Sequence, residues 1–437
     1  MTQDLLFNSQ PEGHIFFTDC TLASAQHQAT GISRVVRSLV DAAAIRDAEA
    51  GRMTYCPVAA FEGCYRVIGL QQAAASTAGS ATRARALARR CDEWLRDRAP
   101  AVERMIVRLV MAAGGIPSWG VTTAAVTTDN APAPFRRNDV LLLADATWAV
   151  PGWTSAVLRA RSQGGRVVPV IYDLLTWSHP QFFAPLFSAQ FKRWLIEIIP
   201  LADACVCISH ATADALQEFA AAEGLASVLP RVGVFPLGTK LTPAASEPRT
   251  EVAAIFARAD RPFLMVGTIE PRKNHALVLD AFERFWASGG TAALVVIGRR
   301  GWQCEATLRR FAALAAAGKP FIHIGDATDA DLQHAYRHAR CLIFPSVAEG
   351  FGLPIVEALA QGLPAIASDI PVHREVGGDL ATYIPLGDPD HLAGLLRSIE
   401  DGSTVLTAPA PGSVHLPTWA ESAAALQAEI DRLLASR

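Results

Sequence analysis

Apolar strand-like runs alternate with helix-type patterns along almost the whole chain, and this alternation limits the possible folds more than any other feature. Short runs rich in Val, Ile, Leu and Phe are followed by longer segments with a period near 3.6. Such an order is typical of parallel α/β proteins, in which helices cover both faces of a sheet. We therefore predict a doubly wound α/β architecture.

The predicted elements fall into two sets. In the first half, strands are expected at residues 14–20, 53–59, 139–145, 166–173, 204–210 and 231–238. Helices are expected there at residues 33–48, 154–162, 184–199 and 212–222. In the second half, helices alternate with strands expected at residues 263–268, 293–298, 321–325, 341–345, 364–368 and 382–385.

A chain of 437 residues is too long for one ordinary core, so two domains of roughly 200 residues each are expected. Residues 240–249 (KLTPAASEPR) lose the periodic pattern, which indicates a linker. We predict domains at 1–245 and 250–415. The remainder, 416–437, contains an amphipathic helix predicted at 417–434.

Composition excludes several classes of protein. The 39 basic and 42 acidic residues give a net charge of −3, whereas dedicated nucleic-acid binders are strongly basic. The first residues lack the basic start of a signal peptide, and no run approaches the roughly 18 apolar residues of a membrane span. The cysteines form no Cys-x-x-Cys pair, and Cys205 and Cys207 are predicted to be buried thiols. We expect a cytoplasmic protein that binds no nucleic acid.

The most informative segment is FPSVAEGFGLPIVEALAQGLPAIAS at 344–368. A strand is followed by a loop with Gly350 and Gly352, and then by a helix. The two glycines let the backbone approach a ligand, and the N-terminus of the helix favours phosphate. Glu349 in the loop can accept hydrogen bonds from sugar hydroxyls, and Glu357, one turn into the helix, can reach a ribose.

A second segment, GTIEPRKN at 267–274, ends another predicted strand. Ligands of open α/β sheets bind at this end of the strands. Arg272 and Lys273 offer a bidentate fork and a point charge that suit a diphosphate. The next strand ends in GRRGW, where Arg299 is a further candidate or, alternatively, part of a surface loop.

These segments resemble the retaining glycosyltransferases of family 4, and the resemblance covers nearly the whole chain. Their GT-B fold has two Rossmann-like, doubly wound parallel-sheet domains facing a cleft. The Glu-x7-Glu signature and the GTIEPRKN block carry the resemblance most sharply. It implies that Glu349 contacts the donor sugar and Glu357 the ribose, while Arg272 and Lys273 hold the pyrophosphate. The loop backbone would also contact the donor through Gly350, Phe351, Gly352 and Leu353.

The resemblance extends to the first half. In the family a glycine-rich loop after the first strand lends backbone N–H groups to the donor phosphates, and here Gly31 occupies it with Ser33 nearby. By this resemblance, Asp173 ends a strand that is expected to face the acceptor, and Tyr172 stands where many members have histidine. A role for His179 or His210 stays open. The last helix is expected to cross back to the first domain.

The implied activity is metal-independent, retaining transfer of a hexose from a nucleotide sugar, and no cofactor is expected. The segments TGISRVVR and EPRKN resemble those of bacterial polysaccharide mannosyltransferases. This resemblance favours GDP-mannose as the donor over the rival, a UDP-hexose. The acceptor would be a saccharide or lipid-linked saccharide of the cell surface. A non-catalytic sugar-nucleotide scaffold and a GT-B epimerase are the alternatives.

An arginine-rich, amphipathic stretch at about 80–115 forms a predicted helical insertion of the first domain. Such a helix can lie on anionic lipid at the cytoplasmic face of the membrane. The alternative is a solvated insertion without a membrane role.

Overall fold

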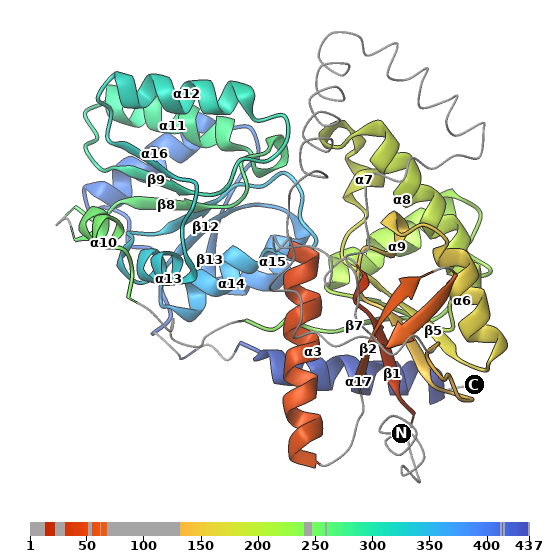
Figure 1. The fold of residues 1–437 in the computed structure, drawn as a ribbon. Coiled ribbons are helices and arrows are strands. Elements are labelled where there is room, and N and C mark those ends of the chain that lie inside the picture. Colours follow the sequence, from red (N-terminus) through yellow and green to blue (C-terminus); the bar gives the residue numbers. More distant parts are fainter. Residues whose placement is uncertain are drawn as a thin grey trace, which may run out of the picture. The chain divides into compact units, whose positions relative to one another are not determined.

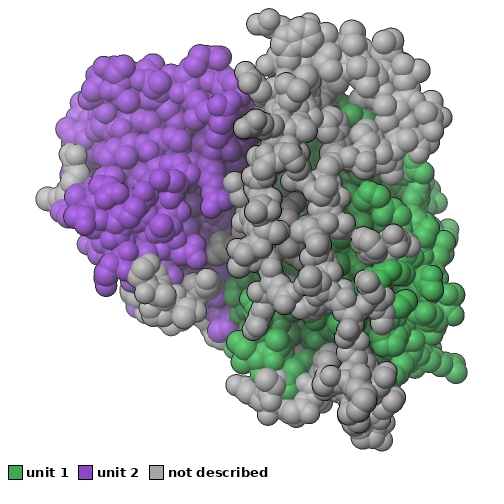
Figure 2. Space-filling view, viewed as in Figure 1, with its two compact units in different colours: residues 1–208, 212–237, 419–437 green, residues 209–211, 238–418 purple. Residues whose placement is uncertain are grey.

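The computed structural model describes residues 14–21, 31–50, 55–61, 63–67, 132–239, 247–257, 260–410, 413 and 416–435. The chain divides into two compact units, coloured separately in Figure 2. Unit 1 comprises residues 1–208, 212–237 and 419–437, and unit 2 comprises residues 209–211 and 238–418. The predicted linker 240–249 begins in residues outside the described set, and its last three residues precede a helix that begins at Thr250.

Unit 1 contains a seven-stranded sheet in the order β3-β2-β1-β4-β5-β6-β7. The strands are β1 (Phe16–Asp19), β2 (Tyr55–Phe61), β3 (Cys64–Val67), β4 (Val140–Leu143), β5 (Arg166–Ile171), β6 (Cys205–Cys207) and β7 (Val232–Val234). Its helices are α3 (Gly31–Ala50), α6 (Trp153–Ser162), α7 (Leu175–Ser178), α8 (Pro185–Ile198), α9 (His210–Ala222) and α17 (Trp419–Ala435), although the first two residues of α9 are grouped with unit 2. All strand pairs are parallel except β2 with β3.

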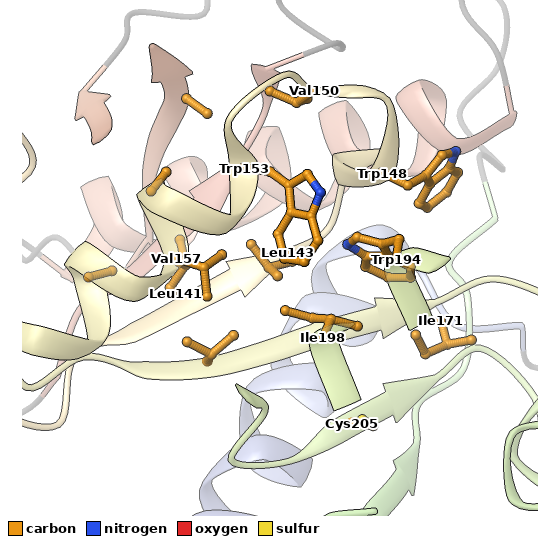
Figure 3. Close-up of a cluster of buried hydrophobic side chains, with 14 of the residues drawn as sticks. Leu141, Leu143, Trp148, Val150, Trp153, Val157, Ile171, Trp194, Ile198 and Cys205 are labelled. Carbon is orange, nitrogen blue, oxygen red and sulfur yellow. The ribbon is translucent and has the colours of Figure 1, made fainter. Parts of the chain in front are cut away.

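Large aromatic side chains fill one face of this sheet. Trp153 and Val157 of α6 lie beside Leu143 and Leu141 of β4, and Trp194 of α8 belongs to the same cluster, as Figure 3 shows. Trp148 packs against Trp194 with ring centroids 5.3 Å apart. The apolar stripes predicted for α6 and α8 therefore bury themselves against the sheet, and Cys205 and Cys207 are fully buried as expected.

The last helix, α17, belongs to unit 1 although it follows the whole of unit 2 in the sequence. Ser422 donates a hydrogen bond to the carbonyl of Pro236, and the Tyr55 hydroxyl donates one to the carbonyl of Ala423. Leu426 and Ile430 are fully buried. Apolar burial therefore holds the end of the chain on the unit that contains its start.

Unit 2 has a six-stranded, all-parallel sheet in the order β10-β9-β8-β11-β12-β13. The strands are β8 (Phe263–Val266), β9 (Leu294–Ile297), β10 (Phe321–Ile324), β11 (Leu342–Phe344), β12 (Ala365–Ser368) and β13 (Ala381–Ile384). The helices are α10 (Thr250–Phe256), α11 (His275–Ala287), α12 (Glu305–Ala316), α13 (Asp329–His338), α14 (Leu353–Ala360), α15 (Pro371–Gly377) and α16 (Pro389–Glu400).

Helices α11, α12 and α16 cover one face of this sheet, and α10, α13 and α14 cover the other (Figure 1). Both faces are therefore buried, which explains the near-continuous apolar strands in the sequence. The strand order is that of a doubly wound sheet, in which the chain changes direction between β8 and β11.

One strand of unit 1 was not predicted. β3 pairs antiparallel with β2 at the sheet edge, so the sheet is not purely parallel. Gly63 lies between the two strands with φ at 74°, the left-handed backbone that a tight hairpin uses. Four residues with no long apolar run carry little strand signal on their own.

No helix among the described residues is long and apolar enough to cross a membrane. The predicted basic insertion at about 80–115 lies outside the described residues.

Candidate functional site

The site of unit 2 lies at the carboxyl ends of β8 and β11, where the strand order of the sheet reverses. The helices that follow β8 and β11, α11 and α14, lie on opposite faces of the sheet, and ligands of open α/β sheets bind at such a reversal. The loop after β8 contains Arg272 and Lys273, and the loop after β11 contains Glu349. A backbone hydrogen bond of 2.9 Å from the Val347 N–H to the Arg272 carbonyl joins the two loops.

Local sequence explains the loop after β8. Gly267 has φ at 153°, at the edge of the range that favours glycine. Pro271 then begins a single 3₁₀ turn that ends at Lys273, and Asn274, with φ at 57°, leads into α11. Asparagine tolerates this left-handed backbone better than most residues. The turn presents Arg272 and Lys273 together.

The loop after β11 ends at Gly352, which has φ at 110° and is the N-cap of α14. Pro354 lies in the first turn of this helix, where a missing N–H costs nothing. Glu357 is the fifth residue of α14, as the sequence predicted. The N-terminus of α14 thus directly follows the loop that carries Glu349; in its first turn the Ile355 N–H donates a 3.0 Å hydrogen bond to the Gly352 carbonyl.

Four charged side chains converge at the joined loops. Arg272 Nη1 lies 2.6 Å from Glu349 Oε2, and Lys273 Nζ lies 2.5 Å from Glu349 Oε1. Arg272 Nη2 donates to Glu270 Oε1 at 2.7 Å, while Nη1 also donates to the Ala348 carbonyl at 2.7 Å. The predicted convergence of acidic and cationic residues from separate loops is present, and their individual roles stay predictions.

These carboxyl groups experience opposing effects. Burial raises the pKa of Glu349, but Lys273 and Arg272 outweigh it and lower that pKa to about 2. Burial also raises the pKa of Glu270, and there the neighbouring cations only partly offset it. Glu349 therefore remains an anion at neutral pH, able to accept hydrogen bonds from a ligand.

Arg272 and Lys273 lie just before α11, where positive charge opposes the helix dipole. In the structure Glu270 and Glu349 supply the compensating negative charge. The aromatic ring of Phe344 also lies beneath Lys273, with Nζ 5.0 Å from the ring centroid.

The other predicted residues are placed as follows. Tyr336 of α13 donates a 2.9 Å hydrogen bond to Glu357 Oε2 and so orients that carboxylate. Arg299 follows β9 and is exposed. Gly350, Phe351 and Leu353 belong to the loop and the first turn beside Glu349.

Two predicted residues belong to unit 1. Gly31 is the first residue of α3. Asp173 follows β5, and its Oδ1 accepts a 3.1 Å hydrogen bond from the Leu175 N–H. The structure therefore brings together Arg272, Lys273 and Glu349 of unit 2, while Gly31 and Asp173 belong to the other unit.

Glu270 and Tyr336 are site residues that the sequence did not single out. Each was found because its side chain hydrogen-bonds a predicted residue: Glu270 accepts from Arg272, and Tyr336 donates to Glu357. For Glu270 a signal was available: it is a carboxylate between the apolar Ile269 and Pro271, two positions before an arginine.

Two buried histidines of unit 2 make its stability depend on pH. Burial lowers the pKa of His275 and of His373 to about 4 each. Both values lie below the ordinary histidine pKa of about 6.5, so the unfolded chain binds protons between pH 6.5 and 4 that the folded chain does not. We expect each histidine to remove about 1.4 kcal/mol of stability per pH unit as pH falls through this window.

Urea unfolding at pH 5, 6 and 7 measures this effect. His275→Phe, which keeps an aromatic ring beside Phe311, should flatten the pH slope, and the exposed control His391→Gln should not. An unchanged slope in His275→Phe would show that the residue titrates normally in the folded state.

The described residues contain no group of three or more His, Cys, Asp or Glu side chains placed to hold a metal ion. The predicted independence of metal remains a prediction, because it concerns the reaction.

A model of the family described as glycosyl transferases group 1 matches residues 253–407, nearly the whole of unit 2. The serotype-specific mannosyltransferase WbdA of Escherichia coli is 31% identical over 304 residues, which are 67% of this chain and 37% of WbdA. The O-antigen chain mannosyltransferase B of E. coli is 34% identical over 142 residues, 32% of this chain and 37% of that protein. The chain thus spans little more than a third of the length of these relatives.

Among solved structures, Anabaena Alr3699/HepE in complex with UDP and glucose aligns with a TM-score of 0.52 at 14% identity. The alignment covers 97% of this chain and 98% of HepE, and it shows a shared fold. The chain therefore has the GT-B fold, carries a glycosyl transferases group 1 domain at residues 253–407, and resembles bacterial mannosyltransferases.

Proposed function

We propose that the protein is a retaining glycosyltransferase that moves mannose from GDP-mannose to a saccharide or lipid-linked saccharide in cell-surface polysaccharide biosynthesis. The observation that carries the proposal is the contact of one buried carboxylate, Glu349, with Arg272 and Lys273 at the strand-order reversal of unit 2. A group 1 glycosyltransferase domain on the same residues supports it.

In this proposal the donor lies along the loop after β11. The first N–H groups of α14 and the loop backbone at Gly350, Phe351, Gly352 and Leu353 bind the diphosphate. Glu357, oriented by Tyr336, accepts hydrogen bonds from the ribose hydroxyls. Arg299 and the backbone of Gly31 add further phosphate contacts.

The chemistry is mainly electrostatic. The bond between the anomeric carbon and the phosphate oxygen breaks, and negative charge develops on the departing nucleoside diphosphate. Lys273 and Arg272 stabilise this charge, and Glu349 orients the sugar. The acceptor hydroxyl attacks the face that the diphosphate leaves and passes its proton to the departing phosphate oxygen, so the anomeric configuration is retained. Arg272 and Lys273 take the role that a divalent metal ion has in other enzymes. Asp173 contacts the acceptor.

The relatives favour mannose as the transferred sugar, since WbdA and the O-antigen chain enzyme are both named mannosyltransferases. UDP-hexose is the rival donor, because the similar fold of HepE was solved with UDP and glucose. We further propose a cytoplasmic location, with peripheral contact to the inner membrane surface at the insertion of 80–115.

Thermal unfolding with GDP-mannose, UDP-glucose and ADP-glucose, each in EDTA, tests the proposal. A ligand at a hundredfold excess over its Kd adds about 2.7 kcal/mol of stability. We expect the largest rise in Tm with GDP-mannose, and slow release of GDP that an added mannoside accelerates. A larger rise in Tm with UDP-glucose would mean that the donor is a UDP-hexose and not GDP-mannose. Binding without any turnover would indicate a scaffold, and release of free sugar that acceptors do not change would indicate an epimerase.

A further inference from the structure

Glu270 is a buried carboxylate that the proposed chemistry does not use. Its side chain is 2% exposed and lies 2.7 Å from Arg272 Nη2. Arg272 in turn reaches Glu349 and the Ala348 carbonyl through Nη1. The three residues form a continuous row of carboxylate, guanidinium and carboxylate that begins after β8 and ends after β11.

Attraction of a diphosphate gives no reason for Glu270. With Glu270 ionised, two carboxylates and two cations meet here, so the cluster carries no surplus positive charge to attract a diphosphate. Glu270 therefore weakens the field that an anionic ligand would feel. Its burial also costs desolvation free energy, which only good geometry around it can offset.

Geometry does give a reason. The guanidinium group is rigid and planar, so holding Nη2 on Glu270 fixes the direction in which Nη1 points. Nη1 then fixes one oxygen of Glu349, and Lys273, with its flexible stem, binds the other. Without Glu270 the guanidinium plane could rotate, and one of the two oxygens of Glu349 would lose its fixed partner.

We propose that Glu270 is a positioning residue for sugar transfer, which acts through Arg272 to orient the Glu349 carboxylate on the donor sugar. This inference rests on the proposed function, since it requires that Glu349 contacts a sugar. It predicts that removal of Glu270 slows the chemical step without weakening the binding of the nucleotide itself.

Two substitutions separate geometry from charge. Glu270→Met fills the space but offers no oxygen to Arg272, and we expect GDP release from GDP-mannose to fall about 30-fold or more, within the range for a misplaced catalytic group. Glu270→Gln keeps an acceptor oxygen without the charge, and we expect turnover within about 5-fold of the original. The Kd for GDP alone should rise less than about 3-fold in both, because nothing in direct contact with the nucleotide is removed and the loss of a negative charge favours an anion.

A double-substitution cycle tests whether Glu270 works through Glu349. In a Glu349→Gln background, adding Glu270→Met should lower turnover by less than about 3-fold, since the residue being oriented is already impaired. The control Glu283→Ala removes an exposed carboxylate of α11 that pairs with Arg310, and it should leave turnover unchanged.

Three results would overturn the inference: Glu270→Met with the original turnover, Glu270→Gln as impaired as Glu270→Met, or an equal loss in the Glu349→Gln background. If thermal unfolding shows that Glu270→Met is not folded, Glu270→Ala serves as a second variant without the carboxylate. UDP-glucose and UDP replace the GDP probes if the original protein prefers them. If the unsubstituted protein binds no nucleotide sugar, the proposed function itself is wrong. This outcome is observed before any variant is made, so it is distinct from failure of the inference on Glu270.

Discussion

Lys273→Ala should lower turnover of the nucleotide sugar by about 10²–10³-fold, the usual effect of removing one preorganised group that stabilises developing negative charge. Lys273 Nζ lies 2.5 Å from Glu349, so its loss removes a charge at the leaving group and a contact that orients the sugar. The measurement is release of GDP from GDP-mannose, with water and with a panel of mannosides as acceptors.

Lys319→Ala provides the control, because this exposed lysine before β10 belongs to the same unit and its loss changes net charge equally. Thermal unfolding of both variants shows whether unit 2 remains folded. Turnover of Lys273→Ala within about 3-fold of the original would refute its electrostatic role, since a group in that role is worth much more.

The sequence was most informative about the regular parts of unit 2. Strand β9 was expected at residues 293–298 and spans Leu294–Ile297, because a run buried on both faces has an unmistakable apolar pattern. The position of the site also followed from the sequence. Parallel strands place their carboxyl ends at one edge, so the loops with Lys273 and Glu349 had to lie near each other.

Contacts between individual side chains could not be predicted in the same way. Lys273 and Glu349 are separated by 76 residues, and their contact depends on β8 lying next to β11 in the sheet. The position of Glu270 depends on the same adjacency, because its carboxylate is held by Arg272, which lies against the loop after β11. Local pattern identifies chemistry-bearing residues, whereas their partners come from the topology of the sheet.

Strand β3 illustrates a different limit. Tyr65 and Cys64 are buried, yet four residues cannot display a period-two pattern that distinguishes a strand from a loop. The strand exists because β2 offers an open edge, which is a property of the assembled sheet rather than of the segment.

Gly298→Ala should destabilise unit 2 by about 3 kcal/mol, at the upper end of the cost of overpacking. A Cβ atom at Gly298 would lie 1.8 Å from the Gly267 carbonyl oxygen and 2.8 Å from its carbon, both backbone atoms that cannot rotate away. The Gly267 N–H also donates to the Ile297 carbonyl at 3.0 Å, so the ends of β8 and β9 would have to separate. Urea or thermal unfolding measures the loss.

The same substitution should lower turnover, because the Gly267 that it displaces begins the loop carrying Arg272 and Lys273. Gly394→Ala is the matched control: this glycine lies within α16 with nothing within 4 Å of its added Cβ, so alanine should add up to about 1 kcal/mol of stability. Stability of Gly298→Ala within about 0.5 kcal/mol of the original would mean that the two strand ends can part at little cost. The rigidity of the site would then have to come from the salt-bridged side chains alone. Full stability without activity would show instead that the strand ends set the position of Lys273 independently of folding.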